Sequence, residues 1–229
     1  MKEKSAPPEL VFEVLGRMQA AGVLDHVVLV GSWVMHFYRI GVPGFGSLGT
    51  VRTMDMDLMI PTPPRFKKNV SLSDMVKDLG FIVQRGRTGF MKLVHSEMDM
   101  DFLVPERGRG SDEPYRVDGL GITAQPIRYA GFLIENTIIV KEGGLTVRVP
   151  EPARFALHKL IISQRRPGKD KAAKDLRQAI EVLSVLWKQS DWARVTKMCR
   201  ALPAGWRTLM RKALEKGDSP DLLEALFVE

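Results

Sequence analysis

The tetrapeptide Met-Asp-Met-Asp occurs twice in this chain, at residues 54–57 and 98–101, each time inside a short apolar run. Apolar runs of this length are typical of buried strands, where an unpaired carboxylate costs far more free energy than a neighbouring methylene returns. Because side chains alternate along a strand, the aspartates of each copy would lie on one face and the methionines on the other. The repeat therefore predicts a sheet with an apolar face and an acidic face.

The acidic face has two interpretations. Asp55 and Asp57 of the first copy, with Asp99 and Asp101 of the second, could lie on exposed strand faces that have no task. If the strands are neighbours, the four carboxylates come within a few ångströms of one another, and they cannot all stay ionised without a compensating cation. Oxygen ligands favour a hard ion, and Mg²⁺ commonly uses one or two carboxylates together with substrate phosphates. The second interpretation predicts a site for Mg²⁺ or Mn²⁺.

A glycine-serine turn supplies the matching anion site. The β-branched run at 26–30 predicts a strand, Gly31 and Ser32 follow it, and residues 33–40 predict a helix. Backbone N–H groups and a hydroxyl at the start of a helix favour bound phosphate, because the helix dipole is positive there. A phosphate cradle beside a carboxylate cluster is typical of two-metal phosphoryl or nucleotidyl transfer.

The hydrophobic pattern changes character near residue 150. Residues 1–150 alternate between helical and strand patterns and include an expected hairpin over 132–149, whereas residues 151–229 are helical throughout. We therefore expect an α/β (α+β) chain, in which a mixed-sheet catalytic domain over 1–150 precedes a helical domain over 151–229.

Composition and charge narrow the class of protein. Cys199 is the only cysteine, no signal peptide is evident at the start, and no apolar stretch is long enough to cross a membrane, so we expect a cytoplasmic protein that does not use a membrane. The net charge is +7, and residues 151–229 hold 16 Lys and Arg against 10 Asp and Glu. This excess suits a polyanion such as RNA, DNA or a triphosphate, and it equally suits a solvated helical surface.

The ordered set of motifs resembles a known superfamily. VLVGSWVMHFY, then RTMDMDLMI, then MDMDFLVP resembles the DNA polymerase β-like nucleotidyltransferase superfamily, in which a strand, Gly-Ser or Gly-Gly, and a helix precede Asp-x-Asp and a later third Asp. The segment VPEPARFALHKLIISQRRPGKDKAAKDLRQAIEVL resembles the part that follows the catalytic domain in stand-alone prokaryotic nucleotidyltransferases, including relatives of toxin–antitoxin nucleotidyltransferases. The resemblance covers roughly residues 24–187.

The resemblance implies roles for the carboxylates. Asp55 and Asp57 would bind both metal ions, and Asp101 would complete the second metal site. Asp101 would also orient or deprotonate the acceptor hydroxyl. Asp99 competes with Asp101 for this third position, so both stay candidate metal ligands at this point.

The resemblance also implies nucleotide-binding residues. Gly31 and Ser32 would hold the β- and γ-phosphates of a nucleoside triphosphate, and Lys159 would neutralise the triphosphate as a point charge. Arg165, which shares a basic turn with Arg166 and Lys169, would touch the nucleotide or the acceptor. An antitoxin-like protein partner is a further expectation of this likeness.

The motifs are compatible with three candidate functions. The favoured one is a Mg²⁺-dependent enzyme that moves a nucleoside monophosphate from an NTP to an acceptor hydroxyl and releases pyrophosphate; RNA (including tRNA), an antibiotic and a protein hydroxyl are all open as acceptors. The alternative is a catalytically inactive nucleotidyltransferase-fold module that binds RNA or a protein partner. A glycosyltransferase with an Asp-x-Asp motif is weaker, because it leaves the second Met-Asp-Met-Asp and the Gly31-Ser32 turn without a role.

Overall fold

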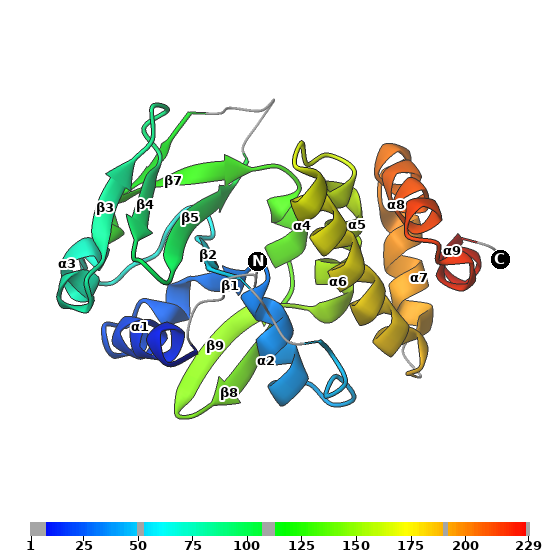
Figure 1. The fold of residues 1–229 in the computed structure, drawn as a ribbon, viewed down its shortest axis with the longest axis horizontal. Coiled ribbons are helices and arrows are strands. Elements are labelled where there is room, and N and C mark those ends of the chain that lie inside the picture. The colour runs from blue at the N-terminus through cyan, green and yellow to red at the C-terminus, as the bar shows by residue number, and fades with distance from the viewer. Residues whose placement is uncertain (1–7, 50–52, 107–112, 190–191, 228–229) are drawn as a thin grey trace. The chain divides into compact units, whose positions relative to one another are not determined.

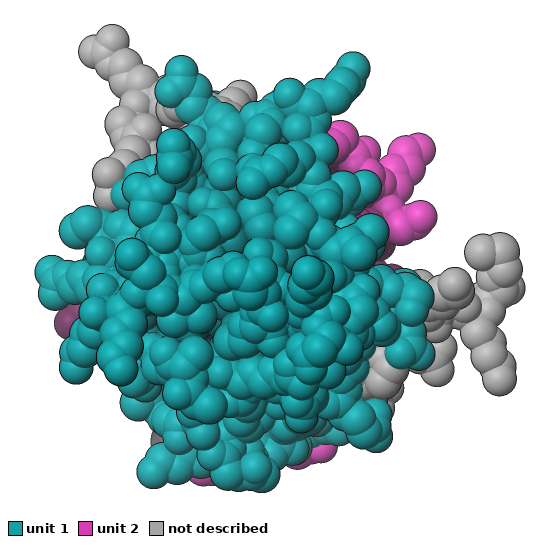
Figure 2. All heavy atoms as spheres, turned by 90° about the vertical axis from the view of Figure 1, so that its left-hand side faces the viewer, with its two compact units in different colours: residues 1–41, 49–150 teal, residues 42–48, 151–229 magenta. Residues whose placement is uncertain are grey.

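The structure is a computed structural model of the 229-residue chain. It describes residues 8–49, 53–106, 113–189 and 192–227. The chain divides into two compact units, shown in teal and magenta in Figure 2. Unit 1 contains residues 1–41 and 49–150, and unit 2 contains residues 42–48 and 151–229.

The centre of unit 1 is a seven-stranded mixed sheet (Figure 1). Its strands are β1 (Val28–Val30), β2 (Asp55–Met59), β3 (Ile82–Arg85), β4 (Met91–Val94), β5 (Asp99–Pro105), β6 (Tyr115–Val117) and β7 (Ile122–Ile127). The main order is β1-β2-β5-β4-β3, while β7 pairs with β5 and β6 pairs with β7. The β2–β5 and β5–β7 pairs are parallel and the other pairs are antiparallel.

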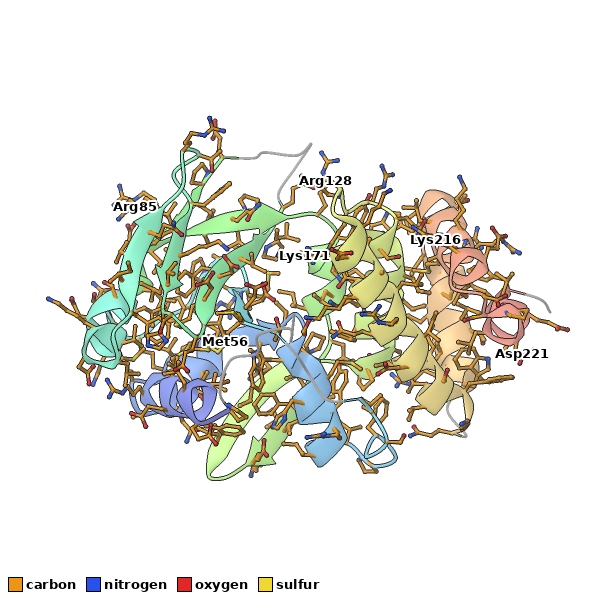
Figure 3. All side chains as sticks on the ribbon, in the orientation of Figure 1. Met56, Arg85, Arg128, Lys171, Lys216 and Asp221 are labelled. Atoms are coloured by element: carbon orange, nitrogen blue, oxygen red, sulfur yellow. The ribbon has the colours of Figure 1, made fainter. Side chains whose placement is uncertain are left out.

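The two Met-Asp-Met-Asp copies form β2 and β5, the neighbouring strands at the middle of the sheet. Met56 and Leu58 of β2, with Met100 of β5, are fully buried, and Figure 3 shows Met56 within unit 1. The aspartates between them are half-buried, so the expected alternation is present in both strands. Arg52, at the start of the expected strand, lies outside the described residues.

Helices and a hairpin complete unit 1. They are α1 (Pro8–Ala20), α2 (Trp33–Gly41), α3 (Leu72–Val76), α4 (Ala130–Ile134), β8 (Thr137–Glu142), β9 (Leu145–Pro150) and the short 3₁₀ turns Leu24–His26, Lys77–Leu79 and Asp118–Leu120. Strand β9 packs against β1 and α1, and β8 packs against α2. The hairpin turns at Gly143 and Gly144, which both have positive φ, as a tight turn between twisted strands requires.

The sequence interpretation was wrong about residues 132–136. We expected a strand to begin at Phe132, but α4 runs to Ile134 and β8 begins only at Thr137. Ala130 and Leu133 lie three residues apart and are both buried, so helical spacing rather than alternation buries this apolar run. Strands β6 and β7 were not expected at all, because β6 has only three residues and β7 contains Pro126.

Unit 2 is mainly helical among the described residues (Figure 1). Its described helices are α5 (Pro152–Ser163), α6 (Lys169–Trp187), α7 (Trp192–Ala201), α8 (Ala204–Lys216) and α9 (Pro220–Phe227). Helix α5 packs along α6 and also contacts α8, and α9 contacts α6, α7 and α8. No described helix is both long and apolar enough to cross a membrane. The expected fold class, a mixed-sheet domain followed by helices, is confirmed.

Candidate active site

The four aspartates lie on one face of the sheet. In the parallel β2–β5 pair, Asp55 is the register partner of Asp99, and Asp57 is the register partner of Asp101. Adjacent strands are about 4.8 Å apart, and register partners point to the same side. The carboxylates of both Met-Asp-Met-Asp copies therefore project from the same face of the sheet.

Gly31 brings the end of β1 directly against this face. Val30, the last residue of β1, is the antiparallel partner of Asp57, and Gly31 follows with a φ of +70°. A Cβ atom on Gly31 would lie 1.9 Å from Oδ2 of Asp57 and 2.8 Å from its Cγ. An L side chain is thus excluded twice, by the left-handed backbone and by the carboxylate. Glycine at this position lets the backbone of the turn approach Asp57.

The turn leads into the nine-residue helix α2. Ser32 is 8% exposed, and its carbonyl accepts a hydrogen bond of 3.1 Å from the N–H of Met35, which closes the first helical turn. The N–H groups at the start of α2 therefore lie at the end of β1, next to the strand that carries Asp57. This is the position at which a helix favours an anion. The geometry combines a phosphate-type site with a carboxylate pair.

A lysine that sequence reasoning missed also belongs to the site. Lys92 on β4 is the register partner of Asp101, and its Nζ lies 2.8 Å from Oδ1 and 2.9 Å from Oδ2 of that carboxylate. Partial burial alone would lower the pKa of Lys92, but the hydrogen bond and charge of Asp101, helped by the charges of Asp55 and Asp99, raise it above its ordinary 10.5. The positive charge of Lys92 therefore partly compensates the negative charge of the acidic face.

The sequence around Lys92 has a strand pattern, but this pattern does not show that Lys92 meets the aspartates. In β4 it alternates with the buried Met91 and Leu93, so the strand has the same apolar-polar pattern as β2 and β5. Strand order determines whether such a lysine meets the aspartates. The sequence does not state that β4 pairs with β5 on the side away from β2.

The donor set of the acidic face fits a divalent ion. Among the described residues, no three His, Cys, Asp or Glu side chains come together closely enough to hold one metal ion. Mg²⁺ does not need three, because it commonly takes one or two carboxylates and completes its octahedron with phosphate oxygens and water. Asp55 and Asp57, which share a face at the Gly31 turn, meet this requirement with hard oxygen donors.

The basic residues expected at the nucleotide, Lys159 and Arg165, lie in unit 2. Lys159 is buried in α5, and its ammonium donates to Asp175 of α6. Arg166 also pairs with Asp175, whereas Arg165 is exposed just after α5. The Lys159 ammonium is thus occupied within the α5–α6 pair. These contacts give Lys159 a part in helix packing, and the roles of Lys159 and Arg165 at the nucleotide stay predictions.

Solved structures similar to this chain include one that shares its fold. The crystal structure of an antigenic nucleotidyltransferase-like protein from Paracoccidioides brasiliensis is 16% identical with a TM-score of 0.52, and the match covers 96% of this chain and 94% of that one. The crystal structure of ANT(2")-Ia in complex with adenylyl-2"-tobramycin is 15% identical with a TM-score of 0.47, and the match covers 91% of this chain and 97% of that one.

Sequence comparison identifies the family directly. No curated protein sequence matches the chain. A family model described as Nucleotidyltransferase matches residues 9–199, which is most of the chain and includes the Gly31 turn and all four aspartates. The family transfers nucleoside monophosphates, so the chain is classed as a transferase, in agreement with the superfamily resemblance of its motifs. This chain belongs to the nucleotidyltransferase family.

Proposed function

We propose that this protein is a Mg²⁺- or Mn²⁺-dependent nucleotidyltransferase that moves a nucleoside monophosphate from an NTP to an acceptor hydroxyl and releases pyrophosphate. The observation that carries the proposal is the register of Asp57 with Asp101 on neighbouring parallel strands, at the place where Gly31 contacts Asp57. Nucleotidyl transfer needs this combination, because the acceptor, the α-phosphate and the leaving pyrophosphate must be aligned in one small volume.

Asp55 and Asp57 are the proposed ligands of the divalent ion. When bound, the ion would neutralise the charge of the triphosphate and stabilise the negative charge that develops during transfer. Gly31 and Ser32, at the start of α2, would direct backbone N–H groups to the β- and γ-phosphates. The protein would do little covalent chemistry and would act by alignment and electrostatics.

Asp101 is the proposed acceptor of the proton from the attacking hydroxyl, and Asp99 is not. The preference rests on register, because Asp101 faces Asp57 beside the Gly31 turn, whereas Asp99 faces Asp55 two residues farther from that turn. Lys92 would position the Asp101 carboxylate, since it contacts both of its oxygens. In the reaction, one Asp101 oxygen would accept the hydroxyl proton while the other kept its contact with Lys92.

Transfer of label from each α-³²P-labelled NTP to pooled tRNA, protein and small hydroxyl acceptors tests the proposal. With Mg²⁺, wild type should label one acceptor class, and Asp57→Asn should reduce the rate about 10²–10³-fold, the size of one strong electrostatic contact. Asp99→Asn is the matched control on the same sheet face, and we expect a loss below about tenfold. The assignment is wrong if wild type labels nothing while an Asp55→Ala/Asp57→Ala variant binds NTP as tightly.

The catalytically inactive binding module is the second candidate, and one observation favours it. Lys92 already neutralises Asp101, so the acidic face can be stable without an ion. This candidate predicts RNA binding that depends on salt but is indifferent to Mg²⁺ and NTP. Turnover of any labelled NTP by wild type that is lost in Asp57→Asn would exclude it.

The acceptor and partner are the remaining parts of the proposal. The positive charge of residues 151–229 supports RNA, including tRNA, as the acceptor. An antitoxin-like partner rests only on the resemblance of the segment after residue 150 to stand-alone prokaryotic nucleotidyltransferases. Co-purification of a small protein encoded beside this chain would test it.

A further inference from the structure

A cavity of about 440 Å³ lies within unit 2, between α7, α8 and α9. Three arginines line it, namely Arg200 from the end of α7 and Arg207 and Arg211 from α8. The last two are four residues apart, so they lie on the same face of α8. Cys199 and Phe227 line the same cavity, the first fully buried and the second half-buried.

These three arginines differ from others in the same unit. Arg166 pairs with Asp175, and Arg194 pairs with Glu151. In contrast, no ion pair joins any cavity arginine to an acidic residue that the structure describes. Arg200 and Arg211 are exposed and Arg207 is half-buried, so their guanidinium groups are open to an anion from solution.

The charges of the three arginines also reach the single cysteine. Burial raises the pKa of the Cys199 thiol to about 11, and the charges of Arg207, Arg200 and Arg211 act in the opposite direction. The three guanidinium groups therefore all act on one point of the cavity wall.

The contact between Arg211 and Phe227 narrows the class of ligand. The guanidinium carbon of Arg211 lies 4.6 Å from the centre of the Phe227 ring. Stacked guanidinium and aromatic planes are surfaces on which nucleobases pack, while free guanidinium groups bind phosphate with two parallel hydrogen bonds. Arg200 and Arg207 are not part of this stack and keep their donors for an anion.

We propose that the cavity between α7, α8 and α9 binds a nucleoside phosphate group, with Arg200 and Arg207 on the phosphate and the Arg211–Phe227 stack beside the base. The group can come from a free nucleotide or from a single-stranded RNA. The inference does not depend on the proposed transfer reaction, because the cavity lies wholly in unit 2 and binding requires no turnover.

Fluorescence anisotropy with a labelled octauridylate, in EDTA and at several salt concentrations, tests the site. We expect Arg200→Gln/Arg207→Gln to weaken binding about tenfold or more and to reduce the slope of log K against log salt by about 0.7, the value for one phosphate contact on a single strand. The matched control is Lys212→Gln/Lys216→Gln, which removes two exposed charges of α8 that do not line the cavity; Figure 3 labels Lys216 on α8. This lysine variant should weaken RNA binding less than about threefold.

Competition identifies the source of the phosphate. Displacement of the RNA by AMP or ATP at much lower concentrations than inorganic phosphate assigns the cavity to a nucleotide, and displacement by RNA alone assigns it to a strand. Equal losses in the arginine and lysine variants would overturn the proposal, because charge alone would then explain binding. Unchanged binding in the arginine variant would overturn it as well.

Alkylation of Cys199 provides a second measurement. The chain has no other cysteine and Cys199 is fully buried, so its slow modification reports on opening of the helices that surround the cavity. We expect saturating ligand to slow alkylation several-fold in wild type but not in Arg200→Gln/Arg207→Gln. Absence of protection in wild type contradicts the proposal. Asp57→Asn should bind and protect as wild type does, which separates this site from the fate of the transfer reaction.

Discussion

At the scale of single residues, the candidate site depends on the absence of a Cβ atom at Gly31. Gly31 combines a φ of +70° with a carboxylate that would meet any Cβ atom at 1.9 Å. The turn can pass this close to Asp57 only because glycine has no side chain. The same approach brings the start of α2 to the acidic face.

Gly31→Ala should therefore disrupt the site more than the fold. We expect a loss of about 1–3 kcal/mol in the free energy of unfolding and at least about 100-fold in transfer rate, because the turn and Asp57 must move apart. Gly131→Ala, in α4, is the matched control: nothing lies within 4 Å of its Cβ and its φ is ordinary, so it should be neutral or slightly stabilising. Urea unfolding and labelled-NTP transfer measure both effects, and equal results for the two variants would contradict the argument.

Lys92 gives a prediction about pH. Its pKa in the folded protein is raised above the ordinary 10.5, so its pairing with Asp101 stabilises the fold fully below pH 10.5, and this contribution disappears as pH rises through the raised value. Wild type should therefore be more stable than Lys92→Met at pH 8, and the difference should shrink at pH 11. Denaturant unfolding of both proteins at the two pH values measures it. A difference that grows with pH would show that Lys92 is not held by Asp101.

At the scale of elements, the parallel pairing of β2 with β5 places the aspartates of the two Met-Asp-Met-Asp motifs side by side. Each strand alone carries two aspartates, and only the register Asp57 to Asp101 joins the copies. Sequence patterns predicted the alternation in both strands, because period-two burial is local. They missed β7, which supports β5 but contains Pro126, and they misread α4, whose apolar run suits a strand equally well.

The α5–α6 pair carries a prediction about stability. Lys159 and Asp175 are both about 95% buried and in contact, so removal of one leaves an uncompensated charge in the interior. Asp175→Ala should destabilise the protein by about 3–5 kcal/mol, whereas Lys159→Met/Asp175→Leu should recover most of this loss. Asp170→Ala, an exposed acid in the same helix, is the control and should cost less than about 1 kcal/mol. Thermal melts separate these cases, and a mild effect of Asp175→Ala would mean that Lys159 reaches solvent.

At the scale of the whole molecule, the chain separates an acidic face from a basic set of helices. Unit 1 holds the four aspartates with Lys92, and unit 2 holds the three arginines of the α7–α9 cavity. Separation of charge along one chain suits a protein that handles a metal-bound nucleotide and a second phosphate-bearing molecule. The segment 42–48, which packs with unit 2, had no signal of this placement in its sequence.

Stabilisation of the whole protein by NTP should depend on the metal ion. A ligand that binds only the folded state stabilises it by about 2.7 kcal/mol at 100 times its dissociation constant. The preferred NTP with Mg²⁺ should therefore raise the melting temperature by several degrees, EDTA should remove most of that shift, and Asp55→Asn/Asp57→Asn should abolish its metal-dependent part. Differential scanning fluorimetry with each of the four NTPs measures it. An identical shift in wild type and the double variant would exclude Asp55 and Asp57 as the metal ligands.

The sequence by itself determined the features that depend on near neighbours: the alternation of Met and Asp, the Gly31-Ser32 turn before a helix, and the change to helices after residue 150. These follow from side-chain periodicity and backbone freedom, which act over a few residues. Only the tertiary structure decided which charges meet. Lys92 reaches Asp101 because β4 lies beside β5, and Lys159 turns inward because Asp175 faces it across two helices. The partner of a charge is set by strand order and helix packing, and these depend on residues far apart in the chain.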